Sequence, residues 1–410
     1  MITITPPLPI SCKTASGNLR SGILISLSAE QARVDWTKHP QNQDGEPITA
    51  LTVETSEFRG KTLSVSSSEQ GIIKFSQDSL PVLQDLLHVI RKGQHLDLCA
   101  NRDVEHSERN NGFSEVKLPV VALPERSWSE ISTETAFLGR NFSAPILITG
   151  MTGGVAQATV INERLASAAA QHNIPMGVGS QRLALENPVH AEIFKLKKKF
   201  PKLFLVGNVG IGQLMGKDFL ELCQRATDMI SADALAIHVN VLQELIQVEG
   251  DRDFRGIIEK IGVINSKLGR PIVVKEVGAG LDLTTAKKLH EVGVRCFDVG
   301  GSGGTSWALI EGLRADDPLI RRRGEVFRDW GIPTAKALAS LAKELPESSL
   351  IATGGIRDGL TVLKAKYLGA TMVGIGLPLM RAALEGPEMP TKLLGSIIHE
   401  LKIAKICSGL

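Results

Sequence analysis

The sequence predicts an α/β protein whose main part is a (β/α)8 barrel, the TIM-barrel fold. Between residue 144 and about residue 385, short apolar runs alternate with amphipathic segments of helical spacing. Eight such runs can be counted, and each is continuously hydrophobic, as parallel strands buried on both faces require. Polar residues and glycines follow the runs, where a barrel of this kind builds its active site.

The predicted strands are short, and helical segments separate them. They are Pro145–Thr149, Pro175–Gly179, Phe204–Gly207, Ala234–Val239, Ile272–Lys275, Cys296–Val299, Leu350–Thr353 and Met372–Ile375. Helical faces are marked by apolar spacing, as at Ile161, Leu165 and Ala168, or at Ile257, Ile261, Ile264 and Leu268. An open doubly wound sheet is the alternative, but it usually has five or six parallel strands, and the first strand-to-helix turn here lacks GxGxxG.

Residues 1 to about 88 differ in texture from the rest of the chain. They are rich in Ser and Thr, and short apolar stretches such as Gly22–Ser26 are separated by polar turns. We interpret 1–88 as an N-terminal extension of unknown role, either a small β-rich appendage or a partly ordered arm, followed by a barrel domain at 89–410. A helical pattern from Leu80 to Ile90 joins the two parts.

Charge and cysteine content narrow the class of protein. The 410 residues include 46 basic and 44 acidic ones, a formal net charge of +2, so no global field attracts nucleic acid or an anionic membrane. The dense basic stretches at Lys195–Lys199 and Arg321–Arg323 are typical of solvated surfaces. Five scattered cysteines without a CxxC pair argue against a disulfide framework or a zinc site. With no signal peptide and no apolar run of ~18 residues, we expect a cytoplasmic protein.

The strongest local motif is a glycine-rich turn after the seventh strand. Gly354, Gly355, Ile356 and Arg357 form this turn, and Gly376 follows the eighth strand. Glycines let backbone N–H groups approach an anion, and a helix N-terminus adds its dipole. The turn therefore predicts a phosphate site, although the glycines could serve only to make tight turns.

Three further groups of residues could carry chemistry. Lys275 ends the fifth strand and could pair with a phosphate, form a Schiff base or stabilise negative charge on a bound ring, unless it simply lies on the surface. The stretch from His238 to Asp251 contains Glu244, a hard oxygen ligand suited to Mg²⁺, although a solvated helix would also look like this. Arg91, Lys92 and His95 could form an anion clamp on one helical face, or could merely complement a helix dipole.

Taken in order, the motifs of the chain resemble those of one enzyme family. They are Arg91-Lys-x-x-His95, Met151-Thr-Gly-Gly154, Met176-Gly-Val-Gly-Ser-Gln-Arg182, His238-x-Asn-x-x-Gln-Glu244, Val274-Lys-Glu276, Gly303-Gly-Thr-Ser-Trp307, Asp329-Trp-Gly-Ile-Pro-Thr334 and Gly354-Gly-Ile-Arg357. The combination is similar to the type 2 isopentenyl-diphosphate isomerases, from about Arg91 to the C-terminus, roughly four fifths of the chain.

The resemblance implies a TIM barrel that binds FMN, Mg²⁺ and a small diphosphate substrate. It implies activity with reduced flavin, commonly reduced by NADPH, and assembly into homo-oligomers of four or more chains. The residues that it assigns to FMN are Met151, Thr152, Gly153, Gly154, Ser180, Asn208, Lys275, Thr305, Gly354, Gly355, Ile356, Arg357, Gly376 and Leu377. Those that it assigns to the substrate are Arg91, Lys92, His95, Ser180, Gln181, Arg182 and Gln243, with Glu244 on the metal and Gln243, His238, Asn240 and Lys275 in catalysis.

The chemistry of the family gives these residues a reason. Moving the double bond adds a proton at the terminal carbon and removes one from the carbon on the other side, through a state close to a tertiary carbocation. An apolar pocket with an electron-rich reduced flavin would stabilise that charge and could pass the proton. Lys275 would favour the anionic reduced flavin.

The chain departs from the family pattern in three places. Residues 1–88 have no recognised counterpart, Val248 stands where the family usually has proline, and the chain ends at Leu410, where family members typically continue with one more short helix. The valine should matter little.

The sequence also bears on three other functions. A 2-hydroxy-acid oxidase would need a His and an Arg near Gly300–Thr305, and neither is present there. A purine-nucleotide dehydrogenase or reductase would need a cysteine in the loop after the sixth strand, whereas Cys296 lies inside the predicted strand. A third hypothesis is that the extension binds a partner and makes the enzyme regulated or scaffolded.

Overall fold

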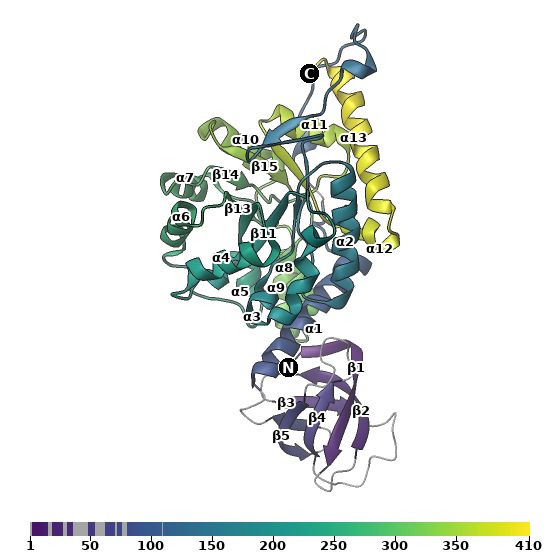
Figure 1. The fold of residues 1–410 in the computed structure, drawn as a ribbon, viewed down its shortest axis with the longest axis vertical. Coiled ribbons are helices and arrows are strands. Elements are labelled where there is room, and N and C mark those ends of the chain that lie inside the picture. Colours follow the sequence, from purple (N-terminus) through teal and green to yellow (C-terminus); the bar gives the residue numbers. More distant parts are fainter. Residues whose placement is uncertain are drawn as a thin grey trace.

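The main body of the protein is a closed barrel of eight parallel strands (Figure 1). The computed structural model describes residues 2–14, 19–27, 31–35, 48–53, 62–69, 72–75, 80–108 and 110–410. The barrel strands are β9 (Ile146–Ile148), β10 (Met176–Gly177), β11 (Leu205–Gly210), β12 (Ala234–Val239), β13 (Ile272–Glu276), β14 (Cys296–Asp298), β15 (Ser349–Thr353) and β16 (Met372–Ile375). They follow one another around the barrel, and β16 closes it by pairing with β9. The predicted fold is confirmed.

The strands are continuously hydrophobic because both of their faces are covered. Every residue of β9, β11 and β16 is buried. The strand β11 runs to Gly210, three residues further than expected, because it continues to pair with β12 as far as His238. The strand β10 is shorter than expected, and pairs with its neighbours only through Met176 and Gly177.

Helices surround the barrel and bury one face each. They are α2 (Ala156–Gln171), α3 (Arg182–Glu186), α4 (Phe219–Ile230), α5 (Val241–Ile246), α6 (Ile257–Lys267), α7 (Leu283–Glu291), α8 (Trp307–Arg314), α9 (Pro318–Val326), α10 (Thr334–Glu344), α11 (Gly359–Tyr367), α12 (Leu377–Glu385) and α13 (Met389–Ser408). Short 3-10 turns are η3 (Phe113–Glu115), η4 (Trp128–Glu130), η5 (Pro188–Phe194), η6 (Leu196–Lys198) and η7 (Ile211–Leu214). The predicted faces are confirmed, since Ile257, Ile261 and Ile264 of α6 are buried.

An aromatic plug fills the amino-terminal end of the barrel. The hairpin of β7 (Thr135–Phe137) and β8 (Arg140–Phe142) supplies Phe137 and Phe142. Both rings pack near Phe204, and the Phe142 and Phe204 centroids lie 5.5 Å apart edge to face. Because side chains close this end, a large ligand can enter only at the carboxyl ends of the strands.

The described residues of the N-terminal extension form a smaller, closed antiparallel barrel. Its strands are β1 (Ile2–Thr14), β2 (Leu19–Leu27), β3 (Gln31–Asp35), β4 (Ile48–Val53), β5 (Thr62–Glu69) and β6 (Ile72–Phe75), in the order β1-β2-β3-β6-β5-β4. Ile10, Leu24, Leu51 and Leu63 are buried. These residues confirm the β-rich interpretation.

One long helix, α1 (Leu80–Asn101), leads from the small barrel to the large one (Figure 1). It continues well beyond Ile90, where the predicted helix ended, and the domain boundary expected at residue 88 falls inside it. Arg91, Lys92 and His95 therefore lie in the middle of a helix and not at its end. The interpretation that these residues complement a helix dipole is wrong for this reason.

The two basic stretches lie on the surface, as the sequence predicted. Lys195 and Lys198 pair with Glu192, Lys197 with Asp233 and Lys199 with Glu163, so the lysine run is a surface ion-pair cluster. The arginines of the other run are exposed along α9. Cys99, Cys223, Cys296 and Cys407 are unpaired. In the part of the chain that the structure describes, every helix is too short or too polar to cross a membrane.

Candidate active site

A large cavity opens at the carboxyl ends of the barrel strands. It measures about 1380 Å³, open mouth included, and is lined by the strand-to-helix loops together with one side of α1. It brings together these predicted site residues: Arg91, Lys92, His95, Met151, Thr152, Ser180, Arg182, Asn208, His238, Asn240, Gln243, Glu244, Lys275, Thr305, Gly354, Gly355, Ile356, Arg357, Gly376 and Leu377.

Three predicted residues, Gly153, Gly154 and Gln181, lie outside this lining. The Gln181 side chain is fully buried, donates from Nε2 to the Ala226 carbonyl at 2.8 Å and accepts the Asn208 N–H at Oε1, also at 2.8 Å. It thus supports the backbone of a lining residue. A Cβ on Gly153 would lie 2.4 Å from the Phe194 ring, so the glycine permits close packing behind the cavity.

One half of the cavity is built from backbone. Gly354 and Gly355 have φ values of +122° and +74°, which residues with a side chain rarely adopt. A Cβ on Gly354 would lie 2.1 Å from the Gly301 carbonyl oxygen, and one on Gly376 would lie 2.8 Å from the sulfur of Met151. Gly376 directly precedes α12, whose N-terminus faces the same region. The turn can therefore offer N–H groups and a helix dipole to an anion.

Arg357 closes this half of the cavity. Its guanidinium pairs with Glu105 and donates to its neighbour's carbonyl, at Ile356, at 2.8 Å. Burial, followed by the charge of Arg381, lowers the pKa of Arg357 to about 10, so it stays cationic at neutral pH.

Lys275 points into the mouth of the barrel, as the strand parity suggested. Its Nζ donates to the Glu276 carbonyl at 2.8 Å and lies 3.9 Å from Oδ2 of Asp298. Asp298 is buried and accepts the Gly300 N–H at 3.1 Å. The ammonium is therefore fixed at the floor of the cavity, in a position to stabilise negative charge on a ring above it. The surface interpretation of Lys275 is wrong.

His238 is held as a neutral imidazole of defined tautomer. Its Nδ1 lies 2.8 Å from Oδ1 of Asn208, whose Nδ2 donates to the Val178 carbonyl at 2.9 Å. The amide oxygen accepts, so Nδ1 carries the hydrogen and Nε2 keeps its lone pair. Burial, followed by the charges of Lys275 and Lys92, lowers the pKa of His238 to about 3.

Asn240 and Glu244 form the oxygen-rich corner of the cavity. Glu244 is buried, and its two oxygens accept from Asn240 Nδ2 at 2.8 Å and from the Asp251 N–H at 3.0 Å. The Asn240 Oδ1 is buried and has no partner among the described residues. Among the described residues, no group of three or more His, Cys, Asp or Glu side chains is arranged to hold a metal ion, so a metal here would need oxygens from a ligand.

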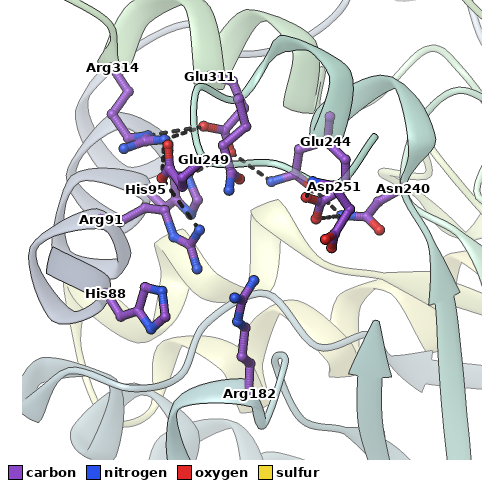
Figure 2. Close-up of polar contacts among 12 residues, drawn as sticks. His88, Arg91, His95, Arg182, Asn240, Glu244, Glu249, Asp251, Glu311 and Arg314 are labelled. Carbon is purple, nitrogen blue, oxygen red and sulfur yellow. Dashed lines mark hydrogen bonds and ion pairs between the residues drawn. The ribbon is translucent and has the colours of Figure 1, made fainter. Parts of the chain in front are cut away.

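A buried carboxylate that the sequence did not reveal organises the other half of the cavity (Figure 2). Glu311 of α8 accepts from Gln243 Nε2 at 2.7 Å, and its Oε1 lies 3.0 Å from Nε2 of His95. Arg314 pairs with its other oxygen at 2.9 Å and with Glu249, also at 2.9 Å. Burial opposes ionisation, but the contact with His95, the charge of Arg314 and the hydrogen bond from Gln243 override it and lower the pKa of Glu311. The available signal was a charged residue within the apolar stretch Trp307-Ala-Leu-Ile-Glu311.

The cations of α1 face this network. Arg91 and His95 are buried on the same side of the helix, and Arg91 lies 3.4 Å from Glu249. Burial, followed by the charges of Arg91 and Arg182, lowers the pKa of Lys92 to about 7. Burial also lowers the pKa of His95 to about 4, so it is uncharged at neutral pH. The predicted clamp therefore places the cations Arg91 and Lys92 beside a neutral His95 inside the cavity, a suitable place for a multiply charged anion.

Comparison with known proteins decides the family. An FMN-dependent dehydrogenase family model matches residues 227–409. The chain is 43% identical over 319 residues to the isopentenyl-diphosphate delta-isomerase of Nostoc sp., covering 78% of this chain and 91% of that protein. It is 42% identical over 331 residues to the enzyme of that name from Pyrococcus furiosus, covering 78% and 83% of the two chains. This chain belongs to the type 2, FMN-dependent isopentenyl-diphosphate delta-isomerase family.

Solved structures agree on the fold of this isomerase family member. A mandelate oxidase variant with benzoyl-formic acid matches with a TM-score of 0.51 at 18% identity, covering 80% of this chain and 94% of that one. The likeness shows the barrel alone. The loop Gly300–Thr305, which supplies no His or Arg here, separates this family member from the 2-hydroxy-acid oxidase hypothesis. Cys296 lies within β14, and burial raises the pKa of its thiol, which disfavours the purine-nucleotide hypothesis.

Proposed function

We propose that this protein interconverts isopentenyl diphosphate and dimethylallyl diphosphate, with FMN as cofactor and Mg²⁺ on the diphosphate. One observation carries the proposal: a single cavity joins two separate anion sites. The glycine turn of Gly354 and Gly355 lies on one side, and the cations Arg91, Lys92 and Arg182 lie on the other. The first suits the phosphate of a flavin nucleotide, and the second suits a diphosphate substrate. Membership of the family supports this assignment.

The residues present fit FMN. The cradle after β15 and β16 depends on glycines that let backbone segments pack closely, as Gly354 does against Gly301 and Gly304 does against Gly355. The residues that would hold the cofactor are Met151, Thr152, Ser180, Asn208, Lys275, Thr305, Gly354, Gly355, Ile356, Arg357, Gly376 and Leu377. When bound and reduced, for which we propose NADPH as reductant, FMN supplies an electron-rich ring that stabilises positive charge and can exchange a proton.

The substrate would be held by its diphosphate. Arg91 and Arg182 carry forked donors, Lys92 adds a point charge, and Ser180 and His95 line the same wall. Glu244 and Oδ1 of Asn240, which has no partner in the part of the chain that the structure describes, are hard oxygen donors for Mg²⁺, which commonly takes one or two carboxylates together with substrate phosphates. The anion is thereby fixed at the α1 side, and the hydrocarbon is directed towards the cavity floor.

Gln243 and His238 are the protein groups that we assign to the reacting end. Gln243 is oriented by its bond to Glu311, and His238 is oriented by Asn208. Both are uncharged at neutral pH, since the pKa of His238 is lowered by burial to about 3. As neutral groups they add no positive charge beside a cationic transition state, and the lone pair on Nε2 of His238 can accept the proton whose loss neutralises that state. The fixed ammonium of Lys275 would hold the ring in its anionic form.

The test follows the conversion directly. Purified protein with bound flavin is reduced without oxygen in the presence of Mg²⁺, and isopentenyl diphosphate is followed by proton NMR. Accumulation of dimethylallyl diphosphate is expected only with the reduced flavin. As a matched variant, Gln243→Ala should lose nearly all turnover and keep its flavin. The absence of product from the reduced parent protein would reject the proposal.

We also propose that the protein assembles into a homo-oligomer of four or more chains. Sedimentation velocity of the full chain tests this, and a species of monomer size at micromolar concentration would contradict it.

A further inference from the structure

A polar seam joins α1 to α3 beside the cation cluster, and its carboxylate, Glu186, has no part in the mechanism above. Arg182 and Glu186 are the first and last residues of α3, and Nε of Arg182 donates to Oε1 of Glu186 at 2.9 Å. The other carboxylate oxygen lies 2.8 Å from Nδ1 of His88 on α1. Glu186 therefore links the arginine of one helix to the histidine of another.

The bond to Glu186 uses only one edge of the Arg182 guanidinium. The two terminal amino groups have no hydrogen-bond or ion-pair partner among the described residues, and Arg182 lines the cavity. Figure 2 shows this guanidinium pointing from α3 towards Arg91. The free edge carries the pair of parallel donors that binds phosphate oxygens in a bidentate way.

Arg182 would not remain in this position by itself. Arg91 and Lys92 are close enough for their pKa values to be lowered by its charge, so the three cations repel one another when no anion is bound. The Arg182 side chain is 27% exposed, which leaves it room to turn towards solvent. A charged acceptor on the same helix opposes that movement.

The acceptor itself is firmly placed. His88 fixes one oxygen of Glu186, and one turn earlier on α1 Asp85 bonds Asn187 at 2.6 Å and His190 at 3.0 Å. Burial raises the pKa of Glu186, but the hydrogen bonds from His88 and Arg182 override it and lower the value to about 2. The carboxylate is therefore negative throughout the working pH range.

We infer that Glu186 is a positioning residue for substrate binding, because it holds Arg182 with its free edge towards the diphosphate and ties that arginine to α1. The inference rests on the proposed function, in which a diphosphate occupies the cation cluster. Glu186 does not touch the substrate. It preorganises a group that does.

The test is a double-mutant cycle on the flavin-loaded full chain. Binding of inorganic diphosphate with Mg²⁺ is measured by calorimetry for the parent, Glu186→Ala, Arg182→Ala and the double variant. Since Glu186→Ala frees one long side chain, it should raise the Kd about 3- to 10-fold. In the Arg182→Ala background the same change should have no further effect, because Glu186 acts through that arginine.

Two more variants serve as controls for this test. Glu186→Gln keeps the shape and an acceptor for Nε, and should bring the Kd within about 3-fold of the parent. Glu192→Gln removes a surface carboxylate that pairs with Lys195 and Lys198, and should leave binding unchanged. In turnover, Glu186→Ala should raise KM for isopentenyl diphosphate by the factor seen in Kd and keep kcat within about 2-fold.

Two results would overturn the inference: an unchanged Kd in Glu186→Ala, or an equal loss in both backgrounds of the cycle. Its failure is distinguishable from failure of the proposed function. A protein that lacks isomerase activity but shows the expected cycle with inorganic diphosphate would reject the function and keep the role of Glu186. An active isomerase that shows no coupling between Glu186 and Arg182 would keep the proposed function and reject the role of Glu186.

Discussion

The two halves of the cavity are built by different means. Around Gly354 and Gly376, the absence of side chains creates the surface, and backbone supplies the polar groups. Around Arg91 and Glu311, side chains from helices far apart in the sequence supply the polar groups. Each charge there is offset only by several others together. The first half is sensitive to any added atom, whereas the second is sensitive to the loss of one partner.

The largest effect should come from breaking the charge network at its centre. Glu311→Ala leaves the buried Arg314 with Glu249 alone and removes the acceptor of Gln243. Removing one partner of a buried ion pair typically costs about 3–5 kcal/mol. We expect a loss near the lower value, because Glu249 remains, together with a severe loss of turnover. Denaturant unfolding measures the loss of stability, and proton NMR measures the loss of turnover.

A companion variant separates charge from shape in this network. Glu311→Gln keeps an oxygen acceptor of similar size and should be less destabilised than Glu311→Ala. If both variants unfold at the same denaturant concentration as the parent, the network does not contribute to the stability of the fold.

The backbone-built half should respond to one added methyl group. Gly354→Ala places a Cβ 2.1 Å from the Gly301 oxygen at a φ of +122°, and such strain typically costs about 1–3 kcal/mol. The turn must shift, so we expect purified protein with little flavin, measured by absorbance. Gly395→Ala in α13 is the control, because its Cβ would meet only the His172 ring at 3.7 Å. Full flavin content in Gly354→Ala would show that the cradle is not the cofactor site.

The side-chain half should also respond to pH, and the glycine turn should not. The pKa of Lys92 is lowered by burial to about 7, so this lysine loses its charge above pH 7 when no anion is bound. Affinity for inorganic diphosphate should then fall by up to about 10-fold per pH unit above 7. Calorimetry from pH 6 to 9 measures this slope. Lys92→Met should bind more weakly and show a flatter profile, and equal slopes in both proteins would exclude Lys92.

The same shift affects stability with a definite sign. The ordinary pKa of lysine is 10.5, so between pH 7 and 10.5 the unfolded chain binds the proton that folded Lys92 releases. The contribution of Lys92 to the free energy of unfolding therefore rises with pH in this window. Lys92→Met should stabilise the ligand-free protein most at pH 6 and least near pH 10.

The sequence revealed the backbone-built half more completely than the other. Glycines after two strands form a local motif, and continuous apolar runs identify parallel strands without knowledge of their neighbours. Glu311 could not be identified from the local sequence, because its role depends on a hydrogen bond from Gln243, 68 residues away, and on the packing of the helices. Gln181 was assigned to the substrate because it lies in a family motif, but its amide is used inside the protein. Such pairings depend on tertiary structure and are not visible in local patterns.

The helical pattern was traced only from Leu80 to Ile90, but α1 continues to Asn101, and Gly93 within it offers the smallest and cleanest contrast. It lies inside α1, where a Cβ would meet nothing within 4 Å, so packing against the barrel maintains the helix despite the residue. Gly93→Ala should stabilise the protein by about 0.5–1 kcal/mol, with unchanged flavin content and KM. Denaturant unfolding of Gly93→Ala, run in parallel with Gly354→Ala, measures this change in stability. Destabilisation would mean that α1 needs the flexibility of a glycine between Lys92 and His95, and that the cation clamp moves when substrate binds.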